Sequence, residues 1–299
     1  MQHYPVMVRE CLEFLGLGPG DTLASARNGV FLDATAGLGG HTAAIASRLQ
    51  QLAGSGWVLS CDRDAESLAL ARANTEELSS RIRFRQSLFS QMEETLAAEG
   101  ISQLDGLLAD LGVSRYQLTG GERGFSLMVD GALDMRMSRG AGQTAADLVN
   151  YESEGNLANL IYGLGEERRS RQIARAIVRA RPITSTLQLA RLIEAVVPRT
   201  GKIHPATQTF MALRMAVNRE LEELDALLAS IPRVLKKGGR AAIITFMSIE
   251  DRKVKQSFQA MAKAGQVKLL NRHVVRPSEE EIRENPPSRS AKLRALELL

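Results

Sequence analysis

The sequence predicts a doubly wound α/β fold in which a helical segment interrupts a seven-stranded sheet. Short apolar runs alternate with segments of helix length through the first third of the chain, as in parallel strands joined by crossover helices. This rhythm stops near residue 114 and returns after residue 205. The chain has 299 residues, 44% hydrophobic and 24% charged, which is ordinary for a globular enzyme.

The first four strands and their connecting helices follow from that alternation. Strands are expected over residues 29–34, 56–62, 82–87 and 104–112. Helices are expected over residues 41–53, 65–80 and 91–100. Because a parallel pair needs a long crossover connection, strands separated by helices of this length should run parallel.

The middle of the chain is expected to be helical. Residues 144–164 and 185–197 each open with a potential capping box, formed by Thr144 with Asp147 and by Ser185 with Gln188. No strand-like run lies between them. We therefore expect this region to be an insertion into the sheet domain.

After the insertion the sheet pattern resumes. Apolar residues at steps of three and four predict one long amphipathic helix over residues 205–231. A helix over 248–264 and strands over 238–246, 266–274 and 290–298 follow. The predicted domains are a discontinuous sheet domain, residues 1–113 and 206–299, and an inserted helical domain, residues 114–205.

Composition narrows the function classes. Cys11 and Cys61 are too few for a disulfide framework and are expected to be reduced thiols of a cytoplasmic protein. The four histidines are scattered, so we expect no metal site. No run of 18 apolar residues suggests a membrane span. The net charge of +4 and pI of about 9.2 are compatible with a nucleic-acid partner.

A glycine turn follows the first predicted strand, in the sequence FLDATAGLGGHT. It lacks the lysine of a P-loop. It also lacks the third glycine of a dinucleotide fingerprint, because Thr42 stands where that glycine would be. A turn that only packs, without ligand, stays a third interpretation, since any tight strand-to-helix turn favours glycine.

Acidic residues at strand ends indicate which kind of ligand the glycine turn would bind. Asp33 ends the first strand, Asp62 the second and Asp110 the fourth. An acid at the end of the second strand can accept both hydroxyls of a ribose. Because Asp33 would repel a pyrophosphate, a cationic ligand such as S-adenosylmethionine is favoured over a dinucleotide and over an NAD-dependent oxidoreductase. Ligands of open α/β sheets bind at this edge, so we expect the three acids to converge there.

The sequence DLGVSRYQLTGGERGFSLMVDGALDMRM, residues 110–137, resembles the bacterial ribosomal RNA small subunit methyltransferase H family, also called MraW. The resemblance extends over nearly the whole chain. It includes HYPVM near the start, DATAGLGGHT, CDRD, GLGEERRSRQIARAIV, HPATQTFMALRMAVNRELEEL, TFMSIEDR and ENPPSRSAKLRA.

The resemblance implies a methyltransferase (Rossmann-like) sheet with a helical domain inserted after the fourth strand. It implies an enzyme that uses S-adenosylmethionine to methylate N4 of one cytidine in the decoding region of the small subunit's 16S rRNA. Carried over by matching motifs, the cofactor contacts are Gly39, Gly40, His41, Asp62, Phe89, Asp110 and Gln117. Asp110 is also the candidate acceptor for the N4 protons, the catalytic role.

This chain departs from the family pattern at two places. Met247 stands where the family usually has histidine, and Ser114-Arg115-Tyr116 replaces the usual Ser-Ser-Pro before Gln117. The first departure keeps an alternative open: a non-catalytic RNA-binding or assembly protein that retains the cofactor fold. If the histidine only packs, methionine can fill its space.

Basic residues suggest where RNA would be held. Residues 166–202 contain nine Arg or Lys against three Glu, and Arg168, Arg171, Arg175 and Arg179 recur at steps of three and four. Such a stripe is expected either to face solvent or to contact phosphates. Three C-terminal residues are further candidates: Arg289, Lys292 and Arg294.

Overall fold

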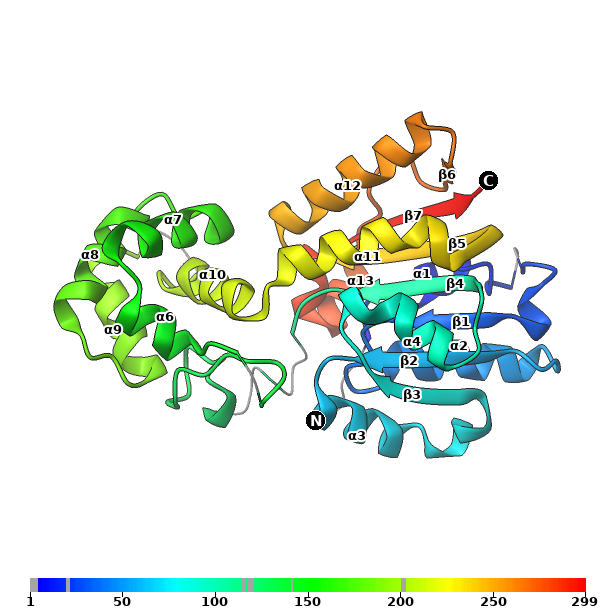
Figure 1. The fold of residues 1–299 in the computed structure, drawn as a ribbon, viewed down its shortest axis with the longest axis horizontal. Helices are drawn as coiled ribbons and strands as arrows, with labels where there is room; N and C mark the ends of the chain where they lie inside the picture. Colours follow the sequence, from blue (N-terminus) through cyan, green and yellow to red (C-terminus); the bar gives the residue numbers. More distant parts are fainter. Residues whose placement is uncertain (1–4, 20–21, 114–116, 118–120, 141, 200–202) are drawn as a thin grey trace. The chain divides into compact units, whose positions relative to one another are not determined.

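In the described part of the chain, seven strands form one sheet in the order β3-β2-β1-β4-β5-β7-β6 (Figure 1). The computed structural model describes residues 5–19, 22–113, 117, 121–140, 142–199 and 203–299. The strands are β1 (Val30–Asp33), β2 (Trp57–Asp62), β3 (Ile82–Gln86), β4 (Leu104–Asp110), β5 (Leu235–Thr245), β6 (Val267–Leu269) and β7 (Lys292–Leu298). The predicted doubly wound, seven-stranded α/β sheet is confirmed.

Helices cover both faces of this sheet (Figure 1). Alternate strand residues point to opposite faces, so Phe31 packs with α1, α2 and α3 while Leu32 packs with α4, α11 and α12. Their bounds are α1 (Val8–Phe14), α2 (Gly40–Gln51), α3 (Ala65–Asn74), α4 (Met92–Ala98), α11 (Glu220–Val234) and α12 (Ser248–Lys263), with α13 (Glu279–Glu284) between β6 and β7.

Strands β1 to β5 run parallel, whereas β7 pairs antiparallel with both β5 and β6. The central strands β4 and β5 are nearly continuous apolar runs because helices bury both of their faces. The antiparallel β7 was not anticipated, since alternation of strands and helices predicts only their order. In the parallel part, the carboxyl ends of β2, β1 and β4 lie side by side.

The chain divides into two compact units, one of Met1–Gly112 with Glu222–Leu299 and one of Val113–Leu221. The second unit is helical in its described residues, with α6 (Ala145–Tyr151), α7 (Glu154–Gly165), α8 (Ser170–Ala180), α9 (Thr186–Val196) and α10 (Thr207–Asn218). It therefore extends beyond residue 205, where the sequence placed the end of the insertion.

Two predicted long helices are each interrupted. The helix expected over 205–231 is two helices, because Arg219 takes a left-handed conformation with φ of 49° and ends α10. The apolar stripe that suggested one helix is shared between two cores: Phe210 packs in the helical unit and Leu224 against the sheet. The helix expected over 144–164 likewise breaks before Ser153, whose side chain caps α7.

The capping residues in the sequence predicted the starts of α6 and α9 correctly. The capping box of Thr144 and Asp147 is present in full. Ser185 caps α9 by accepting from the Gln188 amide, but the Gln188 side chain accepts from Thr184 instead of completing the box. The sequence thus located the starts of both helices, but it did not show that the Gln188 side chain bonds to Thr184.

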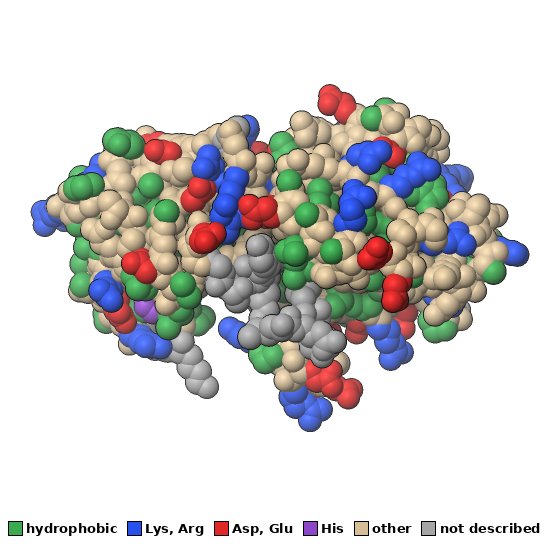
Figure 2. All heavy atoms as spheres, turned by 90° about the horizontal axis from the view of Figure 1, so that it is seen from below, with side chains coloured by type: hydrophobic (Ala, Val, Ile, Leu, Met, Phe, Trp, Pro, Cys, Tyr) green, Lys and Arg blue, Asp and Glu red, His purple; other side chains and the backbone are tan. Residues whose placement is uncertain are grey.

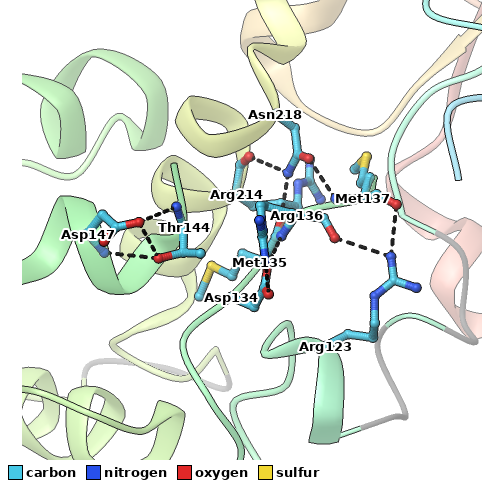
Figure 3. Close-up of polar contacts among 9 residues, drawn as sticks. All are labelled: Arg123, Asp134, Met135, Arg136, Met137, Thr144, Asp147, Arg214 and Asn218. Carbon is cyan, nitrogen blue, oxygen red and sulfur yellow. Dashed lines mark hydrogen bonds and ion pairs between the residues drawn. The ribbon is translucent and has the colours of Figure 1, made fainter. Parts of the chain in front are cut away.

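An irregular loop before α6 is fixed by buried polar side chains (Figure 3). Asn218 donates to the Met135 carbonyl at 2.7 Å and accepts from the Met137 amide at 2.8 Å. Arg123 donates to the Met137 carbonyl at 2.9 Å from the other side. Within the loop, Asp134 and Arg136 form a two-bond ion pair. These contacts hold Met135 at φ of 58°, a conformation that costs a non-glycine residue free energy.

We expect Asn218→Ala to destabilise the helical unit by roughly 3 kcal/mol, because it leaves a buried carbonyl and a buried amide without partners. Urea unfolding measures the loss, and hydrogen exchange of the α6 and α10 amides locates it. Asn159→Ala, at an exposed position of α7, is the matched control and should change little. A loss below about 1 kcal/mol would show that the loop does not depend on Asn218.

Candidate functional site

The glycine turn lies between β1 and α2, at the carboxyl edge of the sheet. Gly37 and Gly39 have φ of 51° and 89°, a region that glycine enters without strain. A Cβ on Gly39 would lie 2.9 Å from Thr75 Cγ2, so a larger residue would also clash. The turn therefore requires its glycines for conformation and for close packing on the end of α3.

Asp62 holds the turn from the neighbouring strand. One carboxylate oxygen accepts from the Gly37 amide at 2.8 Å and the other from the Asp64 amide at 2.9 Å. Each oxygen can accept a second hydrogen bond. The residue expected to bind a ribose thus also shapes the loop that would lie beside that ribose.

Asp110 and His41 face each other at the same edge. His41 Nδ1 lies 3.7 Å from Asp110 Oδ2, and His41 Nε2 lies 2.8 Å from the Val6 carbonyl oxygen. The second Asp110 oxygen, Oδ1, is buried and has no hydrogen-bond partner among the described residues. A buried carboxylate oxygen without a donor is costly, so a ligand donor group fits there.

Asp33 does not take part in the way the sequence suggested. It is fully buried, and its oxygens accept from the Thr42 hydroxyl at 2.6 Å and from the Thr35 amide at 3.1 Å. The three acids therefore lie at one edge of the sheet, as expected, but the buried Asp33 carboxylate cannot be reached by a ligand. Asp33 contributes charge from behind the turn, whereas Asp62 and Asp110 are partly exposed.

Burial controls the electrostatics of this edge. The pKa of both Asp62 and Asp110 is raised to about 6, mainly by desolvation and in smaller part by the charge of Asp33. Two backbone amides oppose the shift at Asp62, and His41 opposes it at Asp110. An acidic, partly desolvated edge favours a cationic ligand and disfavours a pyrophosphate.

The remaining predicted cofactor residues fall in different places. Gly40 begins α2, with Pro5 packed where its Cβ would be, at 2.8 Å. Phe89 is half-buried after β3 and packs on the sheet core. Gln117 is buried in the helical unit, so its cofactor role stays a prediction. Residues 114–116, the altered segment before Gln117, lie outside the described residues.

Met247 is the residue that precedes α12. Its backbone amide donates to the side chain of buried Glu250 at 3.0 Å, in the first turn of that helix. The Met247 side chain is half-buried. The contact with Glu250 uses the backbone and does not depend on which side chain stands at this position.

The basic candidates separate into two groups. Arg175 of α8 lies 3.5 Å from Glu154. Among the described residues, Arg171 and Arg179 of α8 and Arg168, just before that helix, have no ion-pair partner. Lys292 and Arg294 instead pair with Asp251 inside the sheet unit and are mostly buried. On the face drawn in Figure 2, basic side chains are interspersed with acidic ones rather than gathered into one patch.

Sequence reasoning missed two contributors. Thr35 Oγ1 accepts from the Asp110 amide at 2.7 Å and so ties the turn to the end of β4. Val6 contributes only a backbone carbonyl, to which no side-chain pattern points. The described residues contain no group of three His, Cys, Asp or Glu placed to hold a metal ion. Nor do they include a helix long and apolar enough to cross a bilayer.

Comparison with known proteins gives the following. The model of the MraW methylase family matches residues 1–299. Ribosomal RNA small subunit methyltransferase H of Solibacter usitatus is 54% identical over 296 residues, 99% of each chain. The protein of that name from Acidobacterium capsulatum is 43% identical, over 99% of this chain and 98% of its own. A solved putative rRNA-methylase from Clostridium thermocellum aligns with 91% of this chain and 89% of its own, at a TM-score of 0.42 and 11% identity, too slight a likeness to bear on function.

We expect Asp110→Asn to stabilise the protein, measured without any ligand, at neutral pH. The folded protein binds the Asp110 proton more tightly than the unfolded chain, so the free energy of unfolding falls as this carboxyl ionises. The gain from the variant should be largest above about pH 6 and shrink toward pH 4. Thermal unfolding at several pH values measures it.

Asp225→Asn is the control, because Asp225 is an exposed partner of Lys253. It should give no gain that depends on pH in this window. An Asp110→Asn variant that is no more stable at neutral pH, or whose gain grows on acidification, would contradict the assignment of burial as the cause.

Proposed function

The chain belongs to the MraW methylase family, and we propose that it transfers a methyl group from S-adenosylmethionine to N4 of a cytidine in 16S rRNA of the small ribosomal subunit. The observation that carries the proposal is the acidic edge around the glycine turn, where Asp62 and Asp110 flank a donor-rich loop. Full-length relatives named for this activity support it. Because its substrate would be ribosomal RNA, the protein would act in the cytoplasm.

The donor would occupy the carboxyl edge of the sheet. Asp62 would accept the ribose hydroxyls, and Asp110 Oδ1 would accept from the ammonium of the methionine part. Amides at the start of α2 would face its carboxylate. The full proposed set is Gly39, Gly40, His41, Asp62, Phe89, Asp110 and Gln117. When bound, the donor supplies an electrophilic methyl group on a sulfonium.

The target nitrogen is a weak nucleophile, because its lone pair is delocalised into the cytosine ring. The protein must therefore hold N4 in line with the methyl group and accept a proton as the new bond forms. Asp110, at the end of β4, is the proposed acceptor. Its raised pKa suits that task, since an acceptor works best when its pKa lies near the working pH.

The helical unit is the proposed RNA-binding unit. Arg168, Arg171 and Arg179 offer guanidinium groups that no acid in the described residues engages. Tyr151 and Tyr162 in the same unit are 82% and 62% exposed, so their rings are available to unstacked bases. A target cytosine must leave its stack to reach an enclosed site. Arg289 is a weaker candidate, because its neighbours Lys292 and Arg294 are committed to Asp251.

One observation favours a second function. Met247 replaces the histidine usual in the family, so a protein that binds RNA and cofactor without transferring a methyl group is the alternative. The contact between this position and Glu250 uses the Met247 backbone amide, which either residue would supply. We place methyl transfer first because the relatives that match this chain over nearly their whole length are named as methyltransferases.

The test of function is radiolabelled methyl transfer to 30S particles, to naked rRNA and to no RNA. We expect incorporation into 30S particles, with mass spectrometry placing the label on a cytidine of 16S rRNA. Arg171→Gln and Arg179→Gln should slow transfer without changing donor binding, because they remove phosphate contacts. Arg191→Gln, on α9, is the control outside the stripe. Donor binding without incorporation would favour the non-catalytic alternative.

Asp62→Asn tests the cofactor placement. The amide oxygen can still accept from Gly37, but the amide nitrogen cannot accept from Asp64, so the variant loses that contact together with one charged acceptor for the ribose. Calorimetry should show donor affinity falling at least about tenfold, the effect of losing one hydrogen bond to a charged group. Glu77→Gln, an exposed acid beyond α3, is the control. Unchanged affinity in Asp62→Asn would mean that the donor binds elsewhere.

A further inference from the structure

The contacts of His41 fix where its protons are. Nε2 lies 2.8 Å from the Val6 carbonyl oxygen, which can only accept, so Nε2 carries a hydrogen. A neutral ring then has a bare Nδ1, and that atom faces Asp110 Oδ2 at 3.7 Å. A bare nitrogen and an ionised oxygen in this position would repel each other. A single proton on either atom turns the repulsion into attraction.

The burial of the His41–Asp110 pair and the acidic residues around it favour a proton shared by the two side chains. The His41 side chain is 6% exposed and the Asp110 side chain 21%, so water screens the pair weakly. The charged and titratable groups acting on Asp110 are His41 itself and the acids Asp33, Glu250 and Glu281. Burial also keeps the neighbouring Cys11 thiol protonated, by raising its pKa well above the usual value. The pair therefore lies in a field that attracts positive charge.

A cationic ligand would compete with that proton. The proposed donor carries a sulfonium and an ammonium, and Asp110 Oδ1 is the buried atom still able to accept a donor hydrogen. Positive charge placed beside Asp110 lowers the affinity of the pair for its own proton. Donor binding and proton release should thus be linked.

We propose that His41 is a positioning residue behind Asp110: the pair holds one proton in the donor-free protein, releases it when the cationic donor binds, and can then receive the proton that leaves N4. The inference rests on the proposed function. In the transfer, the N4–carbon bond forms, the carbon–sulfur bond breaks with its electron pair going to sulfur, and the N4 proton passes to Asp110. The distance of 3.7 Å is that of an ion pair, and catalytic contacts of this length often shorten in the complex.

The decisive variant is His41→Gln. A glutamine amide nitrogen can take the place of Nε2 and donate to Val6, but glutamine has no ring nitrogen that could hold a proton facing Asp110. Calorimetry of donor binding, in buffers of different ionisation enthalpy near pH 6, counts the protons released. We expect a substantial fraction of one proton for the wild type near pH 6. In His41→Gln the buried Asp110 carboxyl is left without its partner, so proton release and the pH dependence of donor affinity should be displaced to a different pH range. The exposed His273→Gln is the control.

A second measurement needs neither the variant nor activity. In donor-free wild type, the ¹⁵N shifts of His41 and the ¹³Cγ shift of Asp110 near pH 6 report which atoms are protonated. One shared proton, lost when donor is added, supports the proposal. A neutral His41 beside an ionised Asp110 in the donor-free wild type, or the same profile of proton release against pH in His41→Gln as in the wild type, overturns it. Failure to methylate RNA would refute the proposed function alone, because these readouts do not require transfer.

Discussion

Three carboxylates at the ends of three neighbouring parallel strands are the constraint on which this edge of the molecule depends. Asp33, Asp62 and Asp110 end β1, β2 and β4, and the charge of Asp33 raises the pKa of both other carboxyls. The loop after β1 relieves this conflict. Its amides at Thr35 and Gly37 donate to Asp33 and Asp62, and the Thr35 hydroxyl accepts from the backbone of Asp110. The hydrogen bonds that stabilise the carboxylates of Asp33 and Asp62 thus also fix the conformation of the turn.

Much of this arrangement follows from local pattern. Short apolar runs located all seven strands, three of which end in an acid, and the strand order explains why these distant acids meet at one edge. The pattern could not show which of these carboxylates is exposed to a ligand. Asp33 and Asp62 both end a strand, but Asp33 is buried and accepts from Thr42, which is itself hydrogen-bonded to Ser60, whereas Asp62 stays partly exposed. The difference arises from side chains on other elements.

The errors in helix length have a similar cause. Apolar residues continue at helical spacing through Arg219, so periodicity alone predicts one helix. The break is a single left-handed residue, followed by a change in which core the stripe packs against. Roles that depend on contacts across the chain, such as those of Val6 and Thr35, leave no local signal. His41 was named through family resemblance, whereas its link to Asp110 is visible only in three dimensions.

The discontinuity of the sheet unit has a consequence for synthesis on the ribosome. Strand β4 pairs with β5, yet the whole helical unit is translated between them. The helical unit is contiguous, so it can fold while β4 still has an open edge and only half of the sheet exists. Open apolar edges attract other chains. Completing the sheet therefore waits for translation of β5, and until then the edge of β4 is open to pairing with other chains.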